Sequence, residues 1–236
     1  MITAKAYDDV VVDRFEDTYN GLHYARTNYF GCDTSPADSP QGFLIEQSPR
    51  STVEPHFHGV NQFQVVVRGE GMLGRHELHP ICLHYTAAYT GYGPIHAHDD
   101  WLFYFTLRMQ SEPGAHFLPA DRPLQKPGRR RNLTAEVPLT RDAAKPCWTT
   151  IFEQEADGMA ASLVELPAEG HTTAPAPSDS SGQYVLVLDG TLSHEGRALP
   201  QWSCVLVPRL TAGLPMQAGP DGLSALVLQY PRVAAA

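Results

Sequence analysis

Two pairs of histidines have the clearest chemical potential in this sequence. His56 and His58 form one pair, His96 and His98 form the other, and one residue separates the members of each pair. Successive side chains of a β-strand point to opposite faces, so both members of a pair would face the same side. Neutral imidazole nitrogens that converge from two strands are typical ligands of divalent metal ions. The spacing therefore predicts a metal site, while the alternative is that the pairs are packing or surface residues.

Three further polar residues lie close to these pairs in the sequence. The amide oxygen of Gln62 is a poorer metal ligand than imidazole, so Gln62 either binds the metal or is a hydrogen-bonding residue that does not touch it. In both cases its amide is expected to hydrogen-bond a bound substrate or dioxygen. Gln64 has the same strand parity and is expected to contact a substrate or to be a buried structural glutamine. His84 is a proton carrier if its ring points inward, and a packing residue otherwise. Gln62 and His84 are thus candidate catalytic residues, and Gln64 is a candidate substrate-binding residue.

The composition indicates a soluble globular chain. Its 236 residues can bury one large all-β domain or two smaller ones. No stretch approaches the ~20 apolar residues of a spanning helix, and the N-terminal residues lack the apolar core of a signal peptide, so we expect a cytoplasmic protein. A formal charge of −9 argues against nucleic-acid binding. The four cysteines are widely spaced, which indicates neither a disulfide framework nor a thiolate metal site.

An internal repeat indicates that one β unit occurs twice. Residues 121 positions apart match one another: Gln62 and Gln183, Gly69 and Gly190, Pro94 and Pro215. The same shift places residues 43–46 over 164–167 and residues 102–107 over 223–228. Short apolar runs between turn residues predict strands in both copies. We therefore predict two barrels, at 1–118 and 147–236, joined by a proline- and arginine-rich linker at 119–146.

The first half of the chain resembles the cupin superfamily. The run Pro55-His56-Phe57-His58, followed by Gln62 and Gly69, is similar to the first cupin motif, which normally has a glutamate where this chain has Gln62. Gly93-Pro94-Ile95-His96 resembles the second motif, in which a proline-containing turn precedes the last histidine ligand. The resemblance implies an all-β bicupin, with two jelly-roll barrels (double-stranded β-helices) in tandem. It also implies His56, His58 and His96 as ligands, with His98 as a competing or fourth ligand.

The second copy lacks the candidate ligands. The shift of 121 residues replaces the four histidines, in order, by Pro177, Asp179, Gln217 and Gly219. We therefore expect the C-terminal barrel to pack, dimerise or cover the first barrel rather than to catalyse. The resemblance implies a homodimer.

The function expected from this ligand set is metal-dependent catalysis. Three neutral histidines would leave a divalent ion its full charge, which favours anionic chelating substrates. The cupin resemblance then implies a mononuclear non-haem iron dioxygenase, with Fe(II) favoured, that acts on a small anionic aromatic or chelating compound. One alternative is an isomerase, lyase or hydrolase that uses Zn, Ni or Mn. The other is a non-catalytic small-molecule binding or sensing protein, because residues 94–105 are similar to the sugar-sensing domains of arabinose-type regulators.

Overall fold

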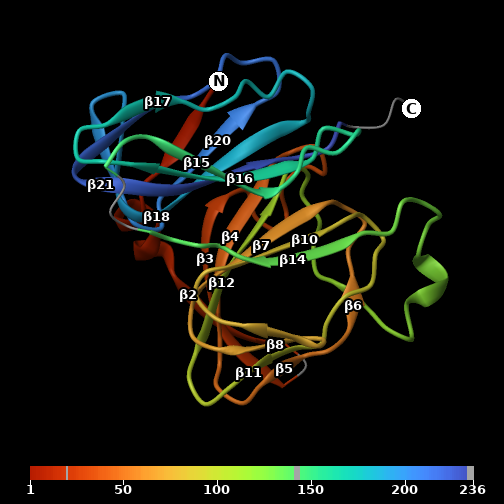
Figure 1. The fold of residues 1–236 in the computed structure, drawn as a ribbon. Coiled ribbons are helices and arrows are strands. Elements are labelled where there is room, and N and C mark those ends of the chain that lie inside the picture. The colour runs from red at the N-terminus through yellow and green to blue at the C-terminus, as the bar shows by residue number, and fades with distance from the viewer. Residues whose placement is uncertain (20, 141–143, 233–236) are drawn as a thin grey trace. The chain divides into compact units, whose positions relative to one another are not determined.

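The regular secondary structure of the computed structural model is almost entirely antiparallel β-strand, which confirms the predicted all-β class (Figure 1). It describes residues 1–19, 21–140 and 144–232. The chain forms two compact units: the N-terminal unit, Asp13–Val137, and the C-terminal unit, which combines Met1–Val12 with Pro138–Ala236. The helical elements of the described residues are short: α1 (Tyr7–Val10) and two 3₁₀ turns, Val11–Asp13 and Arg122–Leu124. None of these described helices has the length and apolar character needed to cross a membrane.

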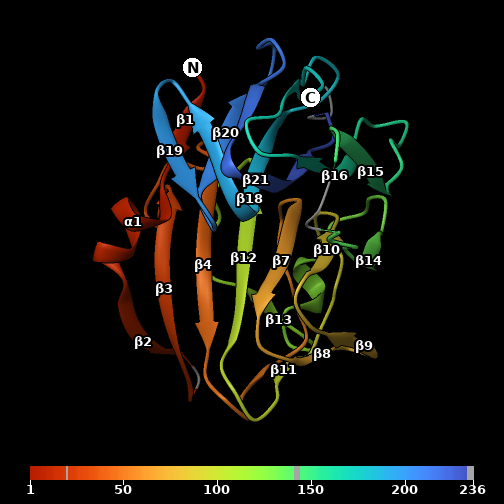
Figure 2. The ribbon, with the colours of Figure 1, turned by 60° about the vertical axis from the view of Figure 1, so that its left-hand side comes forward.

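The N-terminal unit contains three sheets. Its main sheet has seven strands in the order β14-β10-β7-β12-β4-β3-β2, and Figure 2 shows β3, β4, β12, β7 and β10 side by side. These strands are β2 (Phe15–Tyr19), β3 (Leu22–Phe30), β4 (Gln41–Gln47), β7 (Gln62–Arg68), β10 (Cys82–Thr86), β12 (Leu102–Arg108) and β14 (Asn132–Glu136). The four-stranded sheet has the order β5-β11-β8-β9, and β6 pairs with β13. Their bounds are β5 (Thr52–Val53), β6 (His56–Phe57), β8 (Gly71–Leu73), β9 (His76–Leu78), β11 (Ile95–Ala97) and β13 (His116–Phe117).

Alternation along the main sheet separates a polar from an apolar face. In β7, Gln62 and Gln64 share one face, whereas Phe63, Val65 and Val67 share the other. All five side chains are buried, so neither face of this strand is open to water. The face that carries the glutamines is the one that borders the pocket described below.

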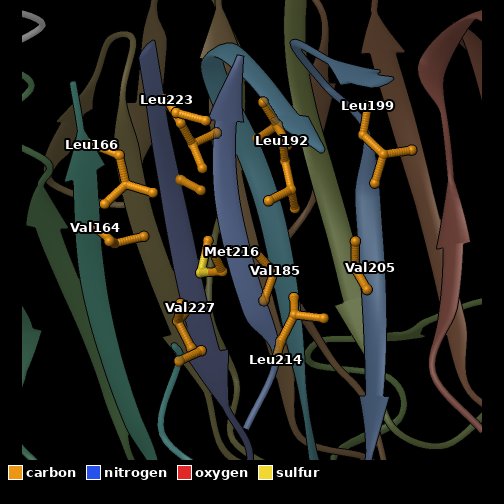
Figure 3. Close-up of a cluster of buried hydrophobic side chains, with 14 of the residues drawn as sticks. Val164, Leu166, Val185, Leu192, Leu199, Val205, Leu214, Met216, Leu223 and Val227 are labelled. Carbon is orange, nitrogen blue, oxygen red and sulfur yellow. The ribbon is translucent and has the colours of Figure 1, made fainter. Parts of the chain in front are cut away.

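The C-terminal unit is built on one sheet of eight strands. Its main path has the order β1-β20-β18-β21-β16-β15, and β17 and β19 pair with β21 and β18. The strands are β1 (Thr3–Lys5), β15 (Cys147–Phe152), β16 (Ala160–Leu166), β17 (His171–Thr173), β18 (Gly182–His194), β19 (Arg197–Pro200), β20 (Cys204–Pro208) and β21 (Pro215–Gln229). The interior is a cluster of buried aliphatic side chains that includes Val185, Leu192, Val205, Met216 and Val227 (Figure 3).

Strand register supports the predicted repeat. The pairing of β12 with β7 is interrupted between Phe103 and Tyr104, and β21 with β18 is interrupted at the equivalent place, 121 residues later. Gly69 and Gly190 both have positive φ, and a Cβ atom on either would lie 2.1 or 2.2 Å from a carbonyl oxygen. Such contacts exclude any side chain, which explains why both positions are glycine.

One part of the repeat needs a different shift. Ile45 pairs with Tyr104, and Val164 pairs with the equivalent Ala225, so β4 corresponds to β16 with a shift of 119 rather than 121. The predicted overlay of residues 43–46 on 164–167 is therefore displaced by two positions. The cause is that the segment between β16 and β18 is longer than the segment between β4 and β7.

The unit boundaries also differ from the predicted ones. We expected residues 1–118 to form the first barrel, yet β1 pairs with β20 and belongs to the C-terminal unit. We expected residues 119–146 to be a linker, yet β14 pairs with β10 and extends the main sheet of the N-terminal unit. A short strand far from its partner in the sequence leaves no local pattern that would reveal the pairing.

Candidate functional site

The N-terminal unit contains a pocket of about 320 Å³. It lies against the polar face of the main sheet and opens beside Tyr19, whose side chain is exposed. Strands β3, β4 and β12 each contribute alternate residues, as the two-residue period of a strand requires, and β7 contributes one residue. The lining residues taken from these strands are Leu22, Tyr24, Arg26, Phe43, Ile45, Gln64, Tyr104, Thr106 and Arg108.

His56 and His58 both line this pocket and are buried. Phe57, between them, points the other way and stacks on His116 at a centroid distance of 4.9 Å. The predicted common orientation of the first histidine pair is therefore present in the structure. The two imidazole centroids are 5.3 Å apart.

The hydrogen bonds of His56 define its tautomer. Its Nδ1 lies 2.7 Å from the carbonyl oxygen of Glu54, which can only accept, so Nδ1 carries the proton. Its Nε2 lies 2.7 Å from the Tyr92 hydroxyl and therefore accepts a hydrogen bond from it. Gln62 donates to the same hydroxyl oxygen from Nε2, at 2.5 Å. Burial lowers the pKa of His56 to about 4 and raises the pKa of Tyr92 to about 12, so both groups are neutral at pH 7.

His58 is fixed by an arginine and a carboxylate. Arg108 Nη2 lies 3.0 Å from Nε2 of His58, and because a guanidinium only donates, Nε2 is the acceptor. Nδ1 of His58 then donates to Glu112 Oε2 at 3.1 Å. The backbone N–H of Gly59 donates to both carboxylate oxygens of Glu112. Burial, followed by the charge of Arg108, holds the pKa of His58 well below its ordinary value.

Arg108 is the hub of this network. It is only 3% exposed, and it also donates to Gln62 Oε1, to Gln41 Oε1 and to the carbonyl oxygen of Glu112 at 2.9–3.2 Å. Two chains of hydrogen bonds start from this guanidinium, one through Gln62 and Tyr92 to His56, the other directly to His58. Arg108 therefore fixes the protonation and orientation of both histidines.

The second histidine pair lies outside the pocket. Ile95 and Ala97 are the buried residues of β11, and Ile95 lines the pocket, so His96 between them faces away. His96 Nδ1 lies 2.9 Å from Thr52 Oγ1, and His98 is exposed. Across residues 1–19, 21–140 and 144–232, no three His, Cys, Asp or Glu side chains lie together in a way that could hold a metal ion. The structure thus does not bring His96 or His98 to His56 and His58.

The donors at the pocket do not fit a metal ion as they are arranged. The Nε2 lone pairs of His56 and His58, which would have to bind the metal, accept hydrogen bonds from Tyr92 and Arg108. The guanidinium of Arg108 is a permanent positive charge beside His58, and it repels a second cation at short range in a buried site. A three-histidine centre would require Arg108 to move and a third donor to enter.

The remaining predicted residues have different positions. Gln64 lines the pocket, and Gln62 lies behind its surface, where it bridges Arg108 and Tyr92. His84 is buried in β10 with Nδ1 against Thr134 Oγ1 and Nε2 against Thr86 Oγ1. Burial lowers the pKa of His84 to about 3, and the ring is not among the residues that line the pocket.

The sequence reasoning missed Arg26, Arg108, Tyr92 and Glu112. Arg108 follows Tyr104 and Thr106 at two-residue spacing, so its parity could have placed it on their face. Tyr92 lies in the Gly-Tyr-Gly-Pro turn before the predicted ligand His96, and a tyrosine in a turn has no strand alternation that would predict its orientation. Glu112 lies in a loop, and its contacts with His58 have no sequence signal.

Comparison with known proteins identifies the fold. No protein-family model matches the sequence, and no curated protein matches it either. A putative dioxygenase from Nostoc punctiforme superposes with a TM-score of 0.71 at 10% identity, covering 100% of this chain and 85% of that one. A bacterial pirin from Escherichia coli, solved with nickel(II), gives 0.61 at 12% identity, with coverages of 99% and 100%. The coconut allergen cocosin gives 0.60 at 10% identity, with coverages of 90% and 82%.

The chain therefore has the bicupin fold, as predicted, with two jelly-roll barrels in tandem. The matching structures include a metal-bound protein and an allergen, so the shared fold does not assign a reaction. The function has to be argued from the pocket.

Proposed function

We propose that the protein is a small-molecule-binding bicupin whose N-terminal unit holds its ligand without a metal ion. One observation carries the proposal: the Nε2 lone pairs of His56 and His58 are already used by Tyr92 and Arg108. The polar groups at the base of the pocket are thus pre-arranged by contacts within the protein. Pre-arranged polar groups lower the cost of ordering a site when a ligand binds.

The size and lining of the pocket support this proposal. A volume of about 320 Å³ lies at the lower end of the range for small-molecule sites. Apolar and aromatic side chains, including Ile45, Val53 and Tyr104, form part of the wall, and Gln64 and Thr106 add polar groups. A mostly apolar wall with few polar groups is typical of ligand pockets.

The contacts of the histidines give less support to the iron dioxygenase that the cupin resemblance implies. Dioxygenase chemistry of that kind needs three protein donors and open metal positions for substrate and oxygen. Here two candidate donors are hydrogen-bonded through the required nitrogens, and His96 faces away. Dioxygenase activity, and the Zn, Ni or Mn alternatives, remain predictions for which Arg108 would first have to leave His58. The homodimer likewise remains a prediction, which light scattering would test.

Metal retention tests the proposal directly. The protein is purified without added metal, incubated with Fe(II), Ni(II), Mn(II) or Zn(II), desalted and analysed by inductively coupled plasma mass spectrometry. We expect less than stoichiometric retention of every metal. The proposal fails if one equivalent is retained by the wild type, lost in His58→Ala and kept in His98→Ala, the matched control for an exposed histidine.

Native mass spectrometry of the same preparation tests ligand binding. We expect a small organic molecule to copurify, and to remain bound after treatment with EDTA. A ligand that EDTA removes and Fe(II) restores would contradict metal-independent binding.

A further inference from the structure

Arg26 is the second arginine in the wall of the pocket. It is 7% exposed, and its guanidinium carbon lies 3.9 Å from the centroid of the Phe43 ring. Nη1 donates to both carboxylate oxygens of Asp33 at 2.9 Å, and Nε donates to Asn28 Oδ1 at 2.8 Å. These contacts hold the guanidinium plane in one orientation.

The third nitrogen of Arg26 lacks an acceptor. Nη2 is shielded from solvent and has no hydrogen-bond partner among the residues that the structure describes. A buried donor that is left unsatisfied is costly, and native proteins rarely keep one without a reason. Arg26 lines the pocket, so a molecule that enters the pocket and shifts the side chains around Nη2 would supply the missing acceptor.

A second guanidinium lies near Arg26. The guanidinium of Arg108 lies 5.7 Å from the same Phe43 ring, so two cations flank one aromatic side chain. The carboxylates of Asp17, Asp33 and Glu112 also line the pocket, so an anion is attracted only to the region close to the two guanidinium groups.

The carboxylates of the pocket already have donors within the protein. Glu112 accepts from Gly59 and His58, as described above. Asp33 accepts from Arg26 and Gln41, and Asp17 from the backbone N–H of Thr18 and the Tyr24 hydroxyl. Among the described charged groups of the pocket, the donor that still lacks an acceptor is Nη2 of Arg26, whose charge is already paired with Asp33.

The wall also has an apolar part, which begins at Ile45, the cross-strand partner of Arg26. Ile45, Val53, Ile95 and Tyr104 border the same pocket, and Phe117 lies near its opening. A ligand that satisfies both regions has an anionic end and a compact hydrocarbon body. Arginine pairs best with planar, bidentate anions such as carboxylates.

We propose that the ligand is a small organic monocarboxylate, and that Arg26 binds its carboxylate group through Nη2. This inference rests on the proposed function, because it names the ligand class of the same metal-free pocket. The apolar body of the ligand packs against the wall formed by Ile45, Val53, Ile95 and Tyr104.

Paired probes separate charge from shape. Isothermal titration calorimetry of the full chain, in buffer with EDTA, compares 3-phenylpropanoate with 3-phenylpropanamide, and cyclohexanecarboxylate with its amide. Each amide matches its carboxylate in size but lacks the negative charge. We expect each carboxylate to bind at least about tenfold more tightly than its amide, because charge-assisted pairing with arginine is the stronger hydrogen bond.

Variants of Arg26 assign the effect to this residue. Arg26→Met keeps an unbranched side chain against Phe43 but removes every donor, and we expect carboxylate affinity to fall about tenfold or more with little change for the amides. Arg68→Met is the matched control, because Arg68 also lies over a phenylalanine ring, Phe103, but is outside the pocket. If circular dichroism shows that Arg26→Met does not fold, Arg26→Lys replaces it. Arg26→Lys keeps the charge without the fork of donors, so a smaller loss is expected for the carboxylates alone.

The outcomes distinguish this inference from the proposed function. Equal affinities for carboxylates and amides, an unchanged carboxylate affinity in the Arg26 variants, or no binding of either carboxylate would overturn the carboxylate assignment. Metal-free binding of the amides would then still support a small-molecule pocket. Binding of the probes only after metal addition would instead overturn the proposed function.

Discussion

The two units share one strand arrangement, but inward-facing positions that are polar in the N-terminal unit are aliphatic in the C-terminal unit. The pocket face of the N-terminal unit carries Gln64, His84 and Thr106, and the equivalent residues of the C-terminal unit are valines. These valines, Val185, Val205 and Val227, belong to the closely packed aliphatic cluster of Figure 3. The backbone scaffold therefore does not decide whether a jelly roll is hollow. A few inward-facing positions decide it.

Equivalent positions are joined by a side-chain hydrogen bond in both units, but the groups that form it differ. Arg108 donates to Gln62 in the N-terminal unit, whereas at the equivalent positions Gln183 donates to Gln229 at 2.9 Å, so donor and acceptor are exchanged. The position of the bond is the same, but the positive charge exists only beside the pocket. The buried positive charge is therefore a feature of the pocket-bearing unit, where its donors also hold several buried acceptors.

The largest effect is expected when Arg108 is replaced by glutamine, the residue found at the equivalent position 229. Arg108→Gln leaves acceptors on His58, Gln62 and Gln41 without their donor, and each unsatisfied buried group costs about 1–3 kcal/mol. We expect the free energy of unfolding to fall by about 3–5 kcal/mol, measured by urea denaturation. The exposed Arg68→Gln is the control. A loss below about 1 kcal/mol would show that Arg108 does not organise the pocket.

Truncating equivalent side chains should lower the free energy of unfolding by different amounts in the two units. Met216 of the C-terminal unit corresponds to Ile95, which borders the pocket. Met216→Ala opens a cavity in a packed core and should cost about 2–5 kcal/mol, whereas Ile95→Ala should cost roughly 1–2 kcal/mol less than that. Urea denaturation of both variants measures the difference. Equal losses of unfolding free energy would mean that Ile95 is packed as closely in its unit as Met216 is in the other.

Acid should weaken the N-terminal unit selectively. Burial lowers the pKa of His56 to about 4 and of His84 to about 3, whereas the unfolded chain takes up these protons near 6.5. Their contribution to stability is therefore complete above pH 6.5 and is lost as the pH falls towards 4, by about 1.4 kcal/mol per pH unit for each histidine. No histidine of the described C-terminal unit is buried.

Hydrogen exchange measured by mass spectrometry at pH 6 and pH 5 checks this prediction. Protection should fall in residues 13–137 more than in the C-terminal unit, after correction for the intrinsic exchange rates. In His84→Gln, the slope of unfolding free energy against pH should decrease by the share of one histidine. An unchanged slope would show that His84 is protonated in the folded protein.

The smallest effect is expected from Thr106→Val, which introduces the residue found at the equivalent position 227. The Thr106 side chain borders the pocket, so the substitution removes a hydroxyl but leaves the packing of the main sheet in place. We expect a change in unfolding free energy of less than about 1 kcal/mol, by urea denaturation. A larger loss would reveal a hydrogen bond that this hydroxyl makes within the folded unit.

Much of the fold could be predicted from the sequence. Short apolar runs and the 121-residue repeat indicate two all-β copies, and His-x-His with Gly69 indicates the cupin fold. The apolar runs and the motif are local patterns, and the repeat appears when the sequence is compared with itself, so a single sequence displays all three. The pairing of β1 with β20 and of β14 with β10 joins distant segments, and no local pattern encodes it.

The site was predictable only where strand phase was clear. The structure places His56, His58 and Gln64 at one pocket, because each lies in or beside a strand whose alternation can be read. His96 follows the turn at Gly93 and Pro94, and a shift of one residue there exchanges the inner and outer faces of β11. Arg108 was missed because its role depends on partners from three other segments.

The pairing of β1 with β20 has a consequence for folding during translation. Residues 13–137 emerge complete before β20 has been translated, so the N-terminal unit can fold while β1 is still without its partner. The C-terminal sheet gains β1 as its edge strand only after β20 has emerged. A short segment translated before the N-terminal unit thus completes a sheet whose other strands are translated after that unit.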